Sequence, residues 1–453
     1  MPSSVFLAGA AKQDITPVMG TRIGGDFVSH IARFIHDPLY AKSLVLKMGE
    51  RYCAIIMLDM CIVPSDLMEE IKMLVTDSIG IRKENILLAC THTHGAPDLV
   101  GILGGAVDIS YRKKLPNLVL KSVLKANENC KPAKIASGKT MVPGLHRCRR
   151  YIMKKKYISE NPVRENSDGI KTNPFGAQNQ ILRSNALVDN EVGFIMIKGL
   201  DGEWISTIAN FSSHYAGDWD VDSITADFYG VFANELRSNI QASDNFVGML
   251  SYGTGADVNT WDFSKSNQTF KTDFKKSNLI GKTIANAISN SIKGLLWEEN
   301  PILDIKYEEL KIPIRKPNAI EVSDSKMVLE KNSIDKIKLD AHGMYVIYAR
   351  EQLLLNEYPE FHLASVQMIK IGSQWIGASG AELFSETGIW LKKNVENDNF
   401  FTICLANTYD GYVPPSHEMK KGGYETWRAR SSFLEDGSEK NIKLALLKLS
   451  KYF

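Results

Sequence analysis

The chain has 453 residues, of which 44% are hydrophobic and 23% are charged, and its formal net charge is +2. This composition is typical of a globular protein with a large core, and the small net charge excludes a general attraction to nucleic acid or acidic membranes. No stretch approaches the roughly 18–20 apolar residues of a membrane span, and the amino terminus does not resemble an export signal. We therefore expect a cytoplasmic protein without integral membrane association. Its six cysteines contain no CxxC pair that would indicate a thiolate metal site.

The first hundred residues predict an α/β arrangement. Runs 39–47 and 51–60 are rich in β-forming residues and flank Gly49, as expected for a hairpin with a central second strand. Residues 65–76 place leucine, isoleucine and methionine at helical spacing and lead to the apolar run 86–90. A strand, a helix and a strand in this order form a βαβ unit. We therefore expect mixed β-sheets flanked by helices.

The apolar runs share one property, because each ends in polar side chains that could react or bind. Run 86–90 leads into His92 and His94, which would point together from the end of a strand, because residues two apart in a strand share a face. Strands aligned in one sheet place their ends together, and sites in open α/β sheets lie at the carboxyl ends of strands. The ends of this run and of runs 204–211, 246–251, 366–378 and 400–406 predict one crevice that collects His92, His94, His214, Asp257, Asn259, Glu382 and Tyr412.

Such a set of side chains is the one expected of a catalytic zinc site. A single His-x-His pair is weak evidence, because backbone carbonyls often satisfy imidazoles and polar residues commonly begin loops. Two or three imidazoles and a carboxylate from separate strands are more specific, since three protein ligands leave one position open for water. The sequence therefore predicts a bound Zn²⁺ at the strand ends.

Two polar segments interrupt the pattern. Residues 147–187 begin with a basic run that contains Arg147, Arg149 and Arg150, and they show no clear periodicity. They fit either a solvated loop or a lid whose arginine clamps an oxyanion or carboxylate of the substrate. Residues 316–345 are rich in lysine and aspartate and indicate an exposed excursion of helix and loop.

Several short motifs follow one another along the chain: IHDPLYAKSLVL at 35–46, CTHTHGAPD at 90–98, NFSSHYAGD at 210–218, SGAELFSETG at 379–388, NTYDGYVPP at 407–415 and GGYE at 422–425. In this order and spacing they resemble the amidase domain of the neutral/alkaline, non-lysosomal ceramidases, a family of zinc-dependent amide hydrolases. The resemblance covers nearly the whole chain. It implies a single catalytic domain over residues 1–453.

The resemblance also implies a ligand set for the zinc ion, which consists of His92, His214, Glu382 and Tyr412. Tyrosine lies outside the usual zinc ligands, and chemistry alone does not favour Tyr412 over Tyr409. The other implied residues are His94, which faces the substrate amide and assists proton transfer or carbonyl polarisation, and an active-site arginine. The best match for that arginine is Arg149, with Arg147 and Arg150 close in register.

The chain departs from the ceramidases in ways that bear on its substrate. Ceramidases carry a serine, once proposed as a nucleophile, in the loop where this chain has Asn259, and an amide side chain cannot serve as that nucleophile. Ceramidases are also longer, secreted or membrane-associated, and have a carboxy-terminal sandwich domain. The segment 147–187 follows no ceramidase pattern. We therefore expect poor activity on ceramide itself.

From these residues we expect hydrolysis of an amide (N-acyl) bond by zinc-activated water. The substrate would be small or soluble, such as an N-acyl amino sugar or an amino lipid head group. His94 or Asp257 would carry the proton to the leaving amine, and Arg149 and Asn259 would orient the substrate or stabilise developing charge. Two alternatives remain open: a metal-dependent enzyme that cleaves an ester or glycosidic bond in a carbohydrate, and a non-catalytic binding protein on the same scaffold.

Overall fold

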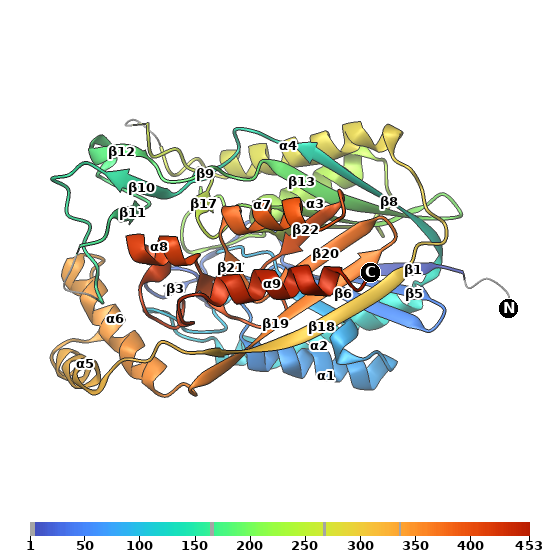
Figure 1. Cartoon of the computed structure of the whole chain (residues 1–453). Helices are drawn as coiled ribbons and strands as arrows, with labels where there is room; N and C mark the ends of the chain where they lie inside the picture. The colour runs from blue at the N-terminus through green and yellow to red at the C-terminus, as the bar shows by residue number, and fades with distance from the viewer. Residues whose placement is uncertain (1–4, 164–166, 266–268, 335–336) are drawn as a thin grey trace.

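The computed structural model describes residues 5–163, 167–265, 269–334 and 337–453, and two packed β-sheets form its centre (Figure 1). The larger sheet has eight strands in the spatial order β16 (Val247–Tyr252), β14 (Trp204–Phe211), β13 (Glu191–Gly199), β8 (Lys131–Met141), β1 (Leu7–Asp14), β5 (Tyr40–Met48), β6 (Arg51–Leu58) and β7 (Ile86–Cys90). The smaller sheet has the order β18 (Leu303–Pro313), β19 (Phe361–Ile371), β20 (Gln374–Ser379) and β22 (Phe400–Ile403).

Helices cover the outer faces of both sheets (Figure 1). The large sheet packs against α1 (Ser65–Ile79), α2 (Ile109–Glu128), α3 (Asp227–Asn239) and α4 (Lys275–Ser291), and the small sheet packs against α7 (Ser385–Asn394) and α9 (Ser438–Ser450). The remaining helices are α5 (Ala319–Lys331), α6 (Ala341–Asn356) and α8 (Ser416–Lys421). The expected mixed sheets flanked by helices are confirmed.

Alternating side chains explain how the large sheet can be buried on both faces. Along β5, Ala41 and Val45 belong to the core that includes α1 and α2, whereas Leu44 and Leu46 belong to the core shared with the small sheet. This alternation follows from the two-residue period of a strand. In the large sheet, β6 pairs in parallel with β7 and β14 pairs in parallel with β16, and the other neighbours are antiparallel.

The segment that follows β22 bridges the two edge strands of the large sheet. The Cys404 N–H donates to the carbonyl of Tyr252 at the end of β16 (2.9 Å), and the Cys90 N–H at the end of β7 donates to the carbonyl of Leu405 (3.3 Å). The ends of β7 and β16 are therefore held close together, although these strands lie at opposite edges of the sheet. The loops after β7 and after β14, the neighbour of β16, consequently meet.

Both polar segments contain regular structure. The segment 147–187 holds β9 (Arg147–Cys148) and a three-stranded sheet made of β10 (Arg150–Met153), β11 (Ile170–Thr172) and β12 (Ile181–Ser184). The segment 316–345 holds α5 and the start of α6, and its residues 335–336 lie outside the described part of the chain. Among the described residues, no helix is both long and apolar enough to cross a membrane.

Candidate active site

Three side chains from separate segments converge on one point. His92 follows β7, His214 follows β14, and Glu382 lies in the short strand β21 (Ala381–Leu383) just beyond β20. Glu382 Oε2 lies 3.5 Å from His92 Nε2 and 3.4 Å from His214 Nε2. All three side chains are at most 2% exposed. The site therefore presents two imidazole nitrogens and one carboxylate oxygen to a common centre.

Both imidazoles are held in the tautomer that a metal requires. His92 Nδ1 lies 2.9 Å from the carbonyl of Cys61, and His214 Nδ1 lies 2.8 Å from the carbonyl of Gly255. Because a carbonyl only accepts, each Nδ1 carries the proton and each Nε2 keeps a free lone pair. Burial lowers the pKa of His92 to about 4 and that of His214 well below its usual range. Both rings are thus neutral, as a metal ligand must be.

The separations between these atoms fit a bound zinc ion. Bonds of 2.0–2.2 Å in tetrahedral geometry place neighbouring ligand atoms roughly 3.3–3.6 Å apart, which matches the measured 3.4 and 3.5 Å. Glu382 is also buried beside two neutral imidazoles, and burial raises its pKa. A divalent cation would balance this carboxylate, so the donor set fits the ion that the sequence predicts.

The backbone at His92 is strained. Its φ is 69°, in the left-handed region that costs a non-glycine residue of order 1–3 kcal/mol. The surrounding structure holds this conformation, because the His92 N–H donates to the carbonyl of Met60 (2.9 Å) and the Thr91 N–H donates to that of Leu58 (2.9 Å). Strain of this kind is typical of residues positioned for function.

Tyr412 completes the cluster. It lies in β23 (Gly411–Val413), which pairs in parallel with β21 so that Tyr412 is directly opposite Glu382. Its hydroxyl is 3.0 Å from His214 Nε2. The hydroxyl of Tyr409, in contrast, is buried in the core without a hydrogen-bond partner among the described residues. The geometry therefore favours Tyr412 over Tyr409 as the tyrosine of the metal site, a choice that chemistry alone left open.

We expect Tyr412→Phe to weaken metal binding roughly 10- to 100-fold, the usual effect of removing a group that supports a metal site. Tyr409→Phe is a matched control, since it removes a buried tyrosine hydroxyl that has no hydrogen-bond partner among the described residues. Titration of metal-free protein with zinc in a competing chelator measures both affinities. Equal affinities for the two variants would contradict the place of Tyr412 in the metal centre.

His94 lies beside the metal cluster and faces a cavity. Its ring stacks on Tyr215 with centroids 3.6 Å apart, and its Nε2 is 3.4 Å from His92 Nε2. Gly25 makes this packing possible, because a Cβ there would come within 2.6 Å of His94 Nδ1. Burial lowers the pKa of His94 well below its usual range. A neutral imidazole at this position can accept a proton.

The three arginines of the basic run have different surroundings. Arg149 lines the cavity, and its Nε donates to Glu425 Oε1 (2.8 Å) while the guanidinium lies over the ring of Tyr412 (5.4 Å). Its Nη2 is buried and finds no acceptor in the described part of the chain. Arg150 is fully buried, and the Arg147 side chain is 43% exposed and lies 4.0 Å from Asp262. Arg149 is therefore the arginine available to a substrate.

Arg150 anchors the segment that carries Arg149. Its guanidinium donates to Glu425 Oε2 (2.6 Å) and to Glu418 Oε2 (2.9 Å). Glu425 also accepts from the hydroxyl of Thr172 (2.8 Å) in β11. One carboxylate thus joins both arginines and two strands of the segment 147–187 to the carboxy-terminal motif GGYE.

Asn259 lies on the wall of the cavity in the short strand β17 (Val258–Asn259). Its Nδ2 donates to Asn173 Oδ1 (2.6 Å), and its own Oδ1 accepts from the N–H of Trp261 (2.9 Å). Asn173 lines the same cavity with φ of 45°, a left-handed conformation that asparagine tolerates. The two amides together form a polar part of the cavity wall.

Asp257 has a different setting from the other candidate residues. It is buried outside the cavity wall, and its Oδ1 accepts from the N–H of Ser385 (2.8 Å) at the start of α7. Burial raises its pKa to about 6. Its carbonyl also accepts from the N–H of Arg149 (2.8 Å). This placement favours a structural role, so His94 is the better candidate for proton transfer.

The cavity above the metal cluster has a volume of about 470 Å³. Its lining is rich in aromatic and aliphatic side chains. Polar groups enter it at a few points, and Asp26 is the carboxylate among the described lining residues. The segment 316–345, expected as an exposed excursion, also contributes Leu339 and Met344 to this wall.

Two other groups of potential ligands are less suited to a metal. Cys61 lies near His92, but burial raises the pKa of its thiol well above the usual range, which disfavours the thiolate that a metal would bind. Glu386, His417 and Glu418 form the second group. There, Glu418 Oε1 accepts from the ammonium of Lys421 at 2.6 Å, and this contact occupies the oxygen that would bind an ion.

Three residues of the site were not found from the sequence. Tyr252 directly follows the run 246–251, and its hydroxyl lies 3.2 Å from Glu382 Oε2, so its position after a strand was an available signal. Asn173 lies in a segment without periodicity, and nothing in its sequence context marks it. Glu425 belongs to the GGYE motif. Its ion pairs with Arg149 and Arg150 join segments that are far apart in the sequence, so no local pattern indicates them.

Solved structures with the same architecture support the resemblance. The chain superposes on the neutral ceramidase from Pseudomonas aeruginosa with a TM-score of 0.72 at 14% sequence identity, covering 99% of this chain and 74% of that one. A ceramidase complexed with C2 gives a TM-score of 0.72 at 14% identity, with 99% and 75% coverage. No protein-family model and no curated protein matches the chain. The chain therefore has the fold of the neutral ceramidases.

Proposed function

We propose that this protein is a zinc-dependent hydrolase that cleaves the amide (N-acyl) bond of a small substrate. One observation carries this proposal: two neutral imidazoles and a buried carboxylate converge at ligand spacing beside a cavity of small-molecule size. The strained backbone at His92 favours a catalytic centre over a binding protein without catalysis. The ceramidase fold adds support, because ceramidases act on an amide.

The residues around the metal centre supply the remaining chemistry. A bound zinc ion lowers the pKa of water to about 7 and polarises a carbonyl. His94, beside the cluster, accepts a proton and returns it to the leaving amine, a contribution of about 10²–10⁴ in rate. Arg149 Nη2, which lacks an acceptor in the described part of the chain, donates to the carbonyl oxygen as negative charge develops. Asn173 and Asn259 orient the polar part of the substrate.

The cavity favours amide over glycosidic cleavage. Glycosidases generally use a pair of carboxylates on either side of the bond that breaks. The described lining residues include one carboxylate, that of Asp26, and His30 Nε2 lies 2.8 Å from its Oδ2. The described lining therefore offers no second carboxylic acid for a glycosidase mechanism, and we propose that the bond cleaved is an amide.

The size of the cavity leads to an expected substrate preference. Its volume of about 470 Å³ is within the usual range for a small-molecule site, which is roughly 300–1,000 Å³. We expect the zinc-loaded protein to hydrolyse short N-acyl amino sugars and N-acyl amino alcohols at least roughly tenfold faster, in kcat/KM, than long-chain ceramide.

Product analysis by mass spectrometry on a panel of short and long N-acyl compounds, with ceramide presented in detergent, tests this. The same panel includes ester and glycoside analogues of the short substrates. A clear preference for long-chain ceramide would contradict the proposed substrate class, and cleavage of esters or glycosides alone would contradict the proposed bond.

A further inference from the structure

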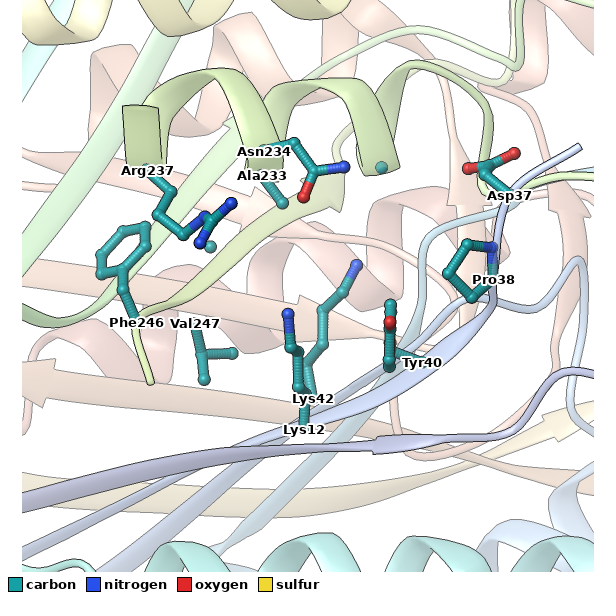
Figure 2. A pocket seen from close by; sticks show the side chains of 12 residues that line it. Lys12, Asp37, Pro38, Tyr40, Lys42, Ala233, Asn234, Arg237, Phe246 and Val247 are labelled. Atoms are coloured by element: carbon teal, nitrogen blue, oxygen red, sulfur yellow. The ribbon is translucent and has the colours of Figure 1, made fainter. Parts of the chain in front are cut away.

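A second, small cavity lies away from the metal centre, between the large sheet and α3. It has a volume of about 40 Å³ and is lined by residues of β1, β5, α3 and β16. Figure 2 shows Lys12 and Lys42 rising from the sheet toward α3, from which Asn234 and Arg237 point back toward them. Three cationic side chains and one amide thus face the same space.

The two lysines are an unfavourable pair in the sheet. Lys12 in β1 is paired directly with Lys42 in β5 in the antiparallel register, and like charges directly opposite each other destabilise a sheet. The charge of Lys42 is balanced by Asp59, whose Oδ1 lies 2.8 Å from its ammonium. Within the described ranges, no carboxylate forms an ion pair with Lys12, whose ammonium lies 4.9 Å from the ring centroid of Tyr40.

The surrounding charges act on Lys12 in one direction. Burial, Arg237 and Lys42 all lower the pKa of its ammonium. Arg237 pairs with Asp244, whose side chain is 94% exposed and therefore lies on the solvent side. Asp37 also lines the cavity: burial raises its pKa, its Oδ2 accepts from the N–H of Ala226 (3.2 Å), and its Oδ1 is buried without a hydrogen-bond partner among the described residues. The lining therefore carries three cationic side chains and one carboxylate, and the carboxylates that pair with Lys42 and Arg237 lie outside it.

We propose that this cavity binds a small tetrahedral oxyanion of the size of phosphate, held by Lys12, Arg237, Lys42 and the amide of Asn234. A volume of about 40 Å³ exceeds the roughly 10–15 Å³ that one water needs, and it is too small for a large ligand. An oxyanion in this position would accept charge-assisted hydrogen bonds from two or three donors at once. It would also relieve the repulsion between the cross-strand lysines.

Isothermal titration with inorganic phosphate, at an ionic strength fixed with sodium chloride, tests the proposal on the full chain. We expect saturable binding by the wild-type protein and at least roughly tenfold weaker binding by Lys12→Gln and by Arg237→Gln, because each loses a charged donor. Lys47→Gln is the matched control. Lys47 also lies in β5 and over a tyrosine ring, at 4.7 Å from that of Tyr52, but it does not line the cavity.

A thermal melt in chloride alone checks that the variants are folded before titration. A phosphate bound only at the metal centre would leave Lys12→Gln and Arg237→Gln with wild-type affinity. That result, or the absence of phosphate binding by the wild-type protein, would overturn the proposal, as would an equal loss of affinity in Lys47→Gln.

Discussion

Replacing His214 with alanine is expected to remove the bound metal and to lower kcat/KM by at least roughly 10³-fold, since a catalytic metal contributes several kcal/mol of transition-state stabilisation. His214 supplies one of the three atoms that converge at 3.4–3.5 Å, and its loss leaves one imidazole and one carboxylate, beside Tyr412, which hold a zinc ion far less tightly. Elemental analysis of purified protein and an assay on a short N-acyl substrate measure the two losses together.

His417→Ala provides the matched control for this experiment. His417 belongs to the group of potential ligands formed with Glu386 and Glu418, and its Nε2 lies 2.9 Å from Glu386. Its side chain is far more exposed than that of His214. We expect this variant to keep one zinc ion per chain and wild-type activity. If His417→Ala lost the metal and His214→Ala retained it, the metal centre would have been placed in the wrong cluster.

Arg149→Lys is expected to lower kcat/KM roughly 10²- to 10³-fold although the positive charge is preserved, as is usual for loss of a donor to a developing oxyanion. The guanidinium uses its Nε for Glu425 and lines the cavity, and its buried Nη2 has no acceptor among the described residues. A lysine ammonium is a single point and cannot make the contact with Glu425 and reach the substrate in the same geometry.

Arg147→Lys is the control for this change. Arg147 is two residues away, in the same basic run, but it lies outside the cavity lining and is partly exposed to solvent. We expect its kinetics to match those of the wild type. Equal losses in the two variants would indicate a general effect of the basic run on the protein and would remove Arg149 from the proposed mechanism.

Much of the fold could be predicted because it follows from local patterns. The strand Trp204–Phe211 has the bounds expected from its apolar run, and α1 begins at Ser65 as its periodicity indicates. The rule that strand ends carry reactive side chains identified His92, His214 and Glu382, since each is close to the end of a strand. These elements are determined by residues close together in the sequence, so the spacing of apolar residues is enough to predict them.

Other features depend on contacts between distant segments. The ion pairs of Arg150 with Glu418 and Glu425 span more than 260 residues, and no local pattern distinguishes Arg149 from its neighbours before these contacts are known. The same holds for Leu339, which looks like part of a solvated segment in the sequence and lines the cavity beside His94 and His214. Sequence patterns also could not show that Asp257 accepts a hydrogen bond from the start of α7.

The buried anchor formed by Arg150 has a consequence for how the enzyme would choose its substrates. Withdrawing Arg150 from its two carboxylates would leave buried charges unpaired, which costs about 3–5 kcal/mol. The wall that bears Arg149 and Asn173 therefore stays in place when the site is empty, and no ordering step has to accompany substrate entry. Substrate selection would then depend on size and shape alone. A molecule too long for the cavity would not bind, and one that fits would find the hydrogen-bond donors already oriented toward its carbonyl.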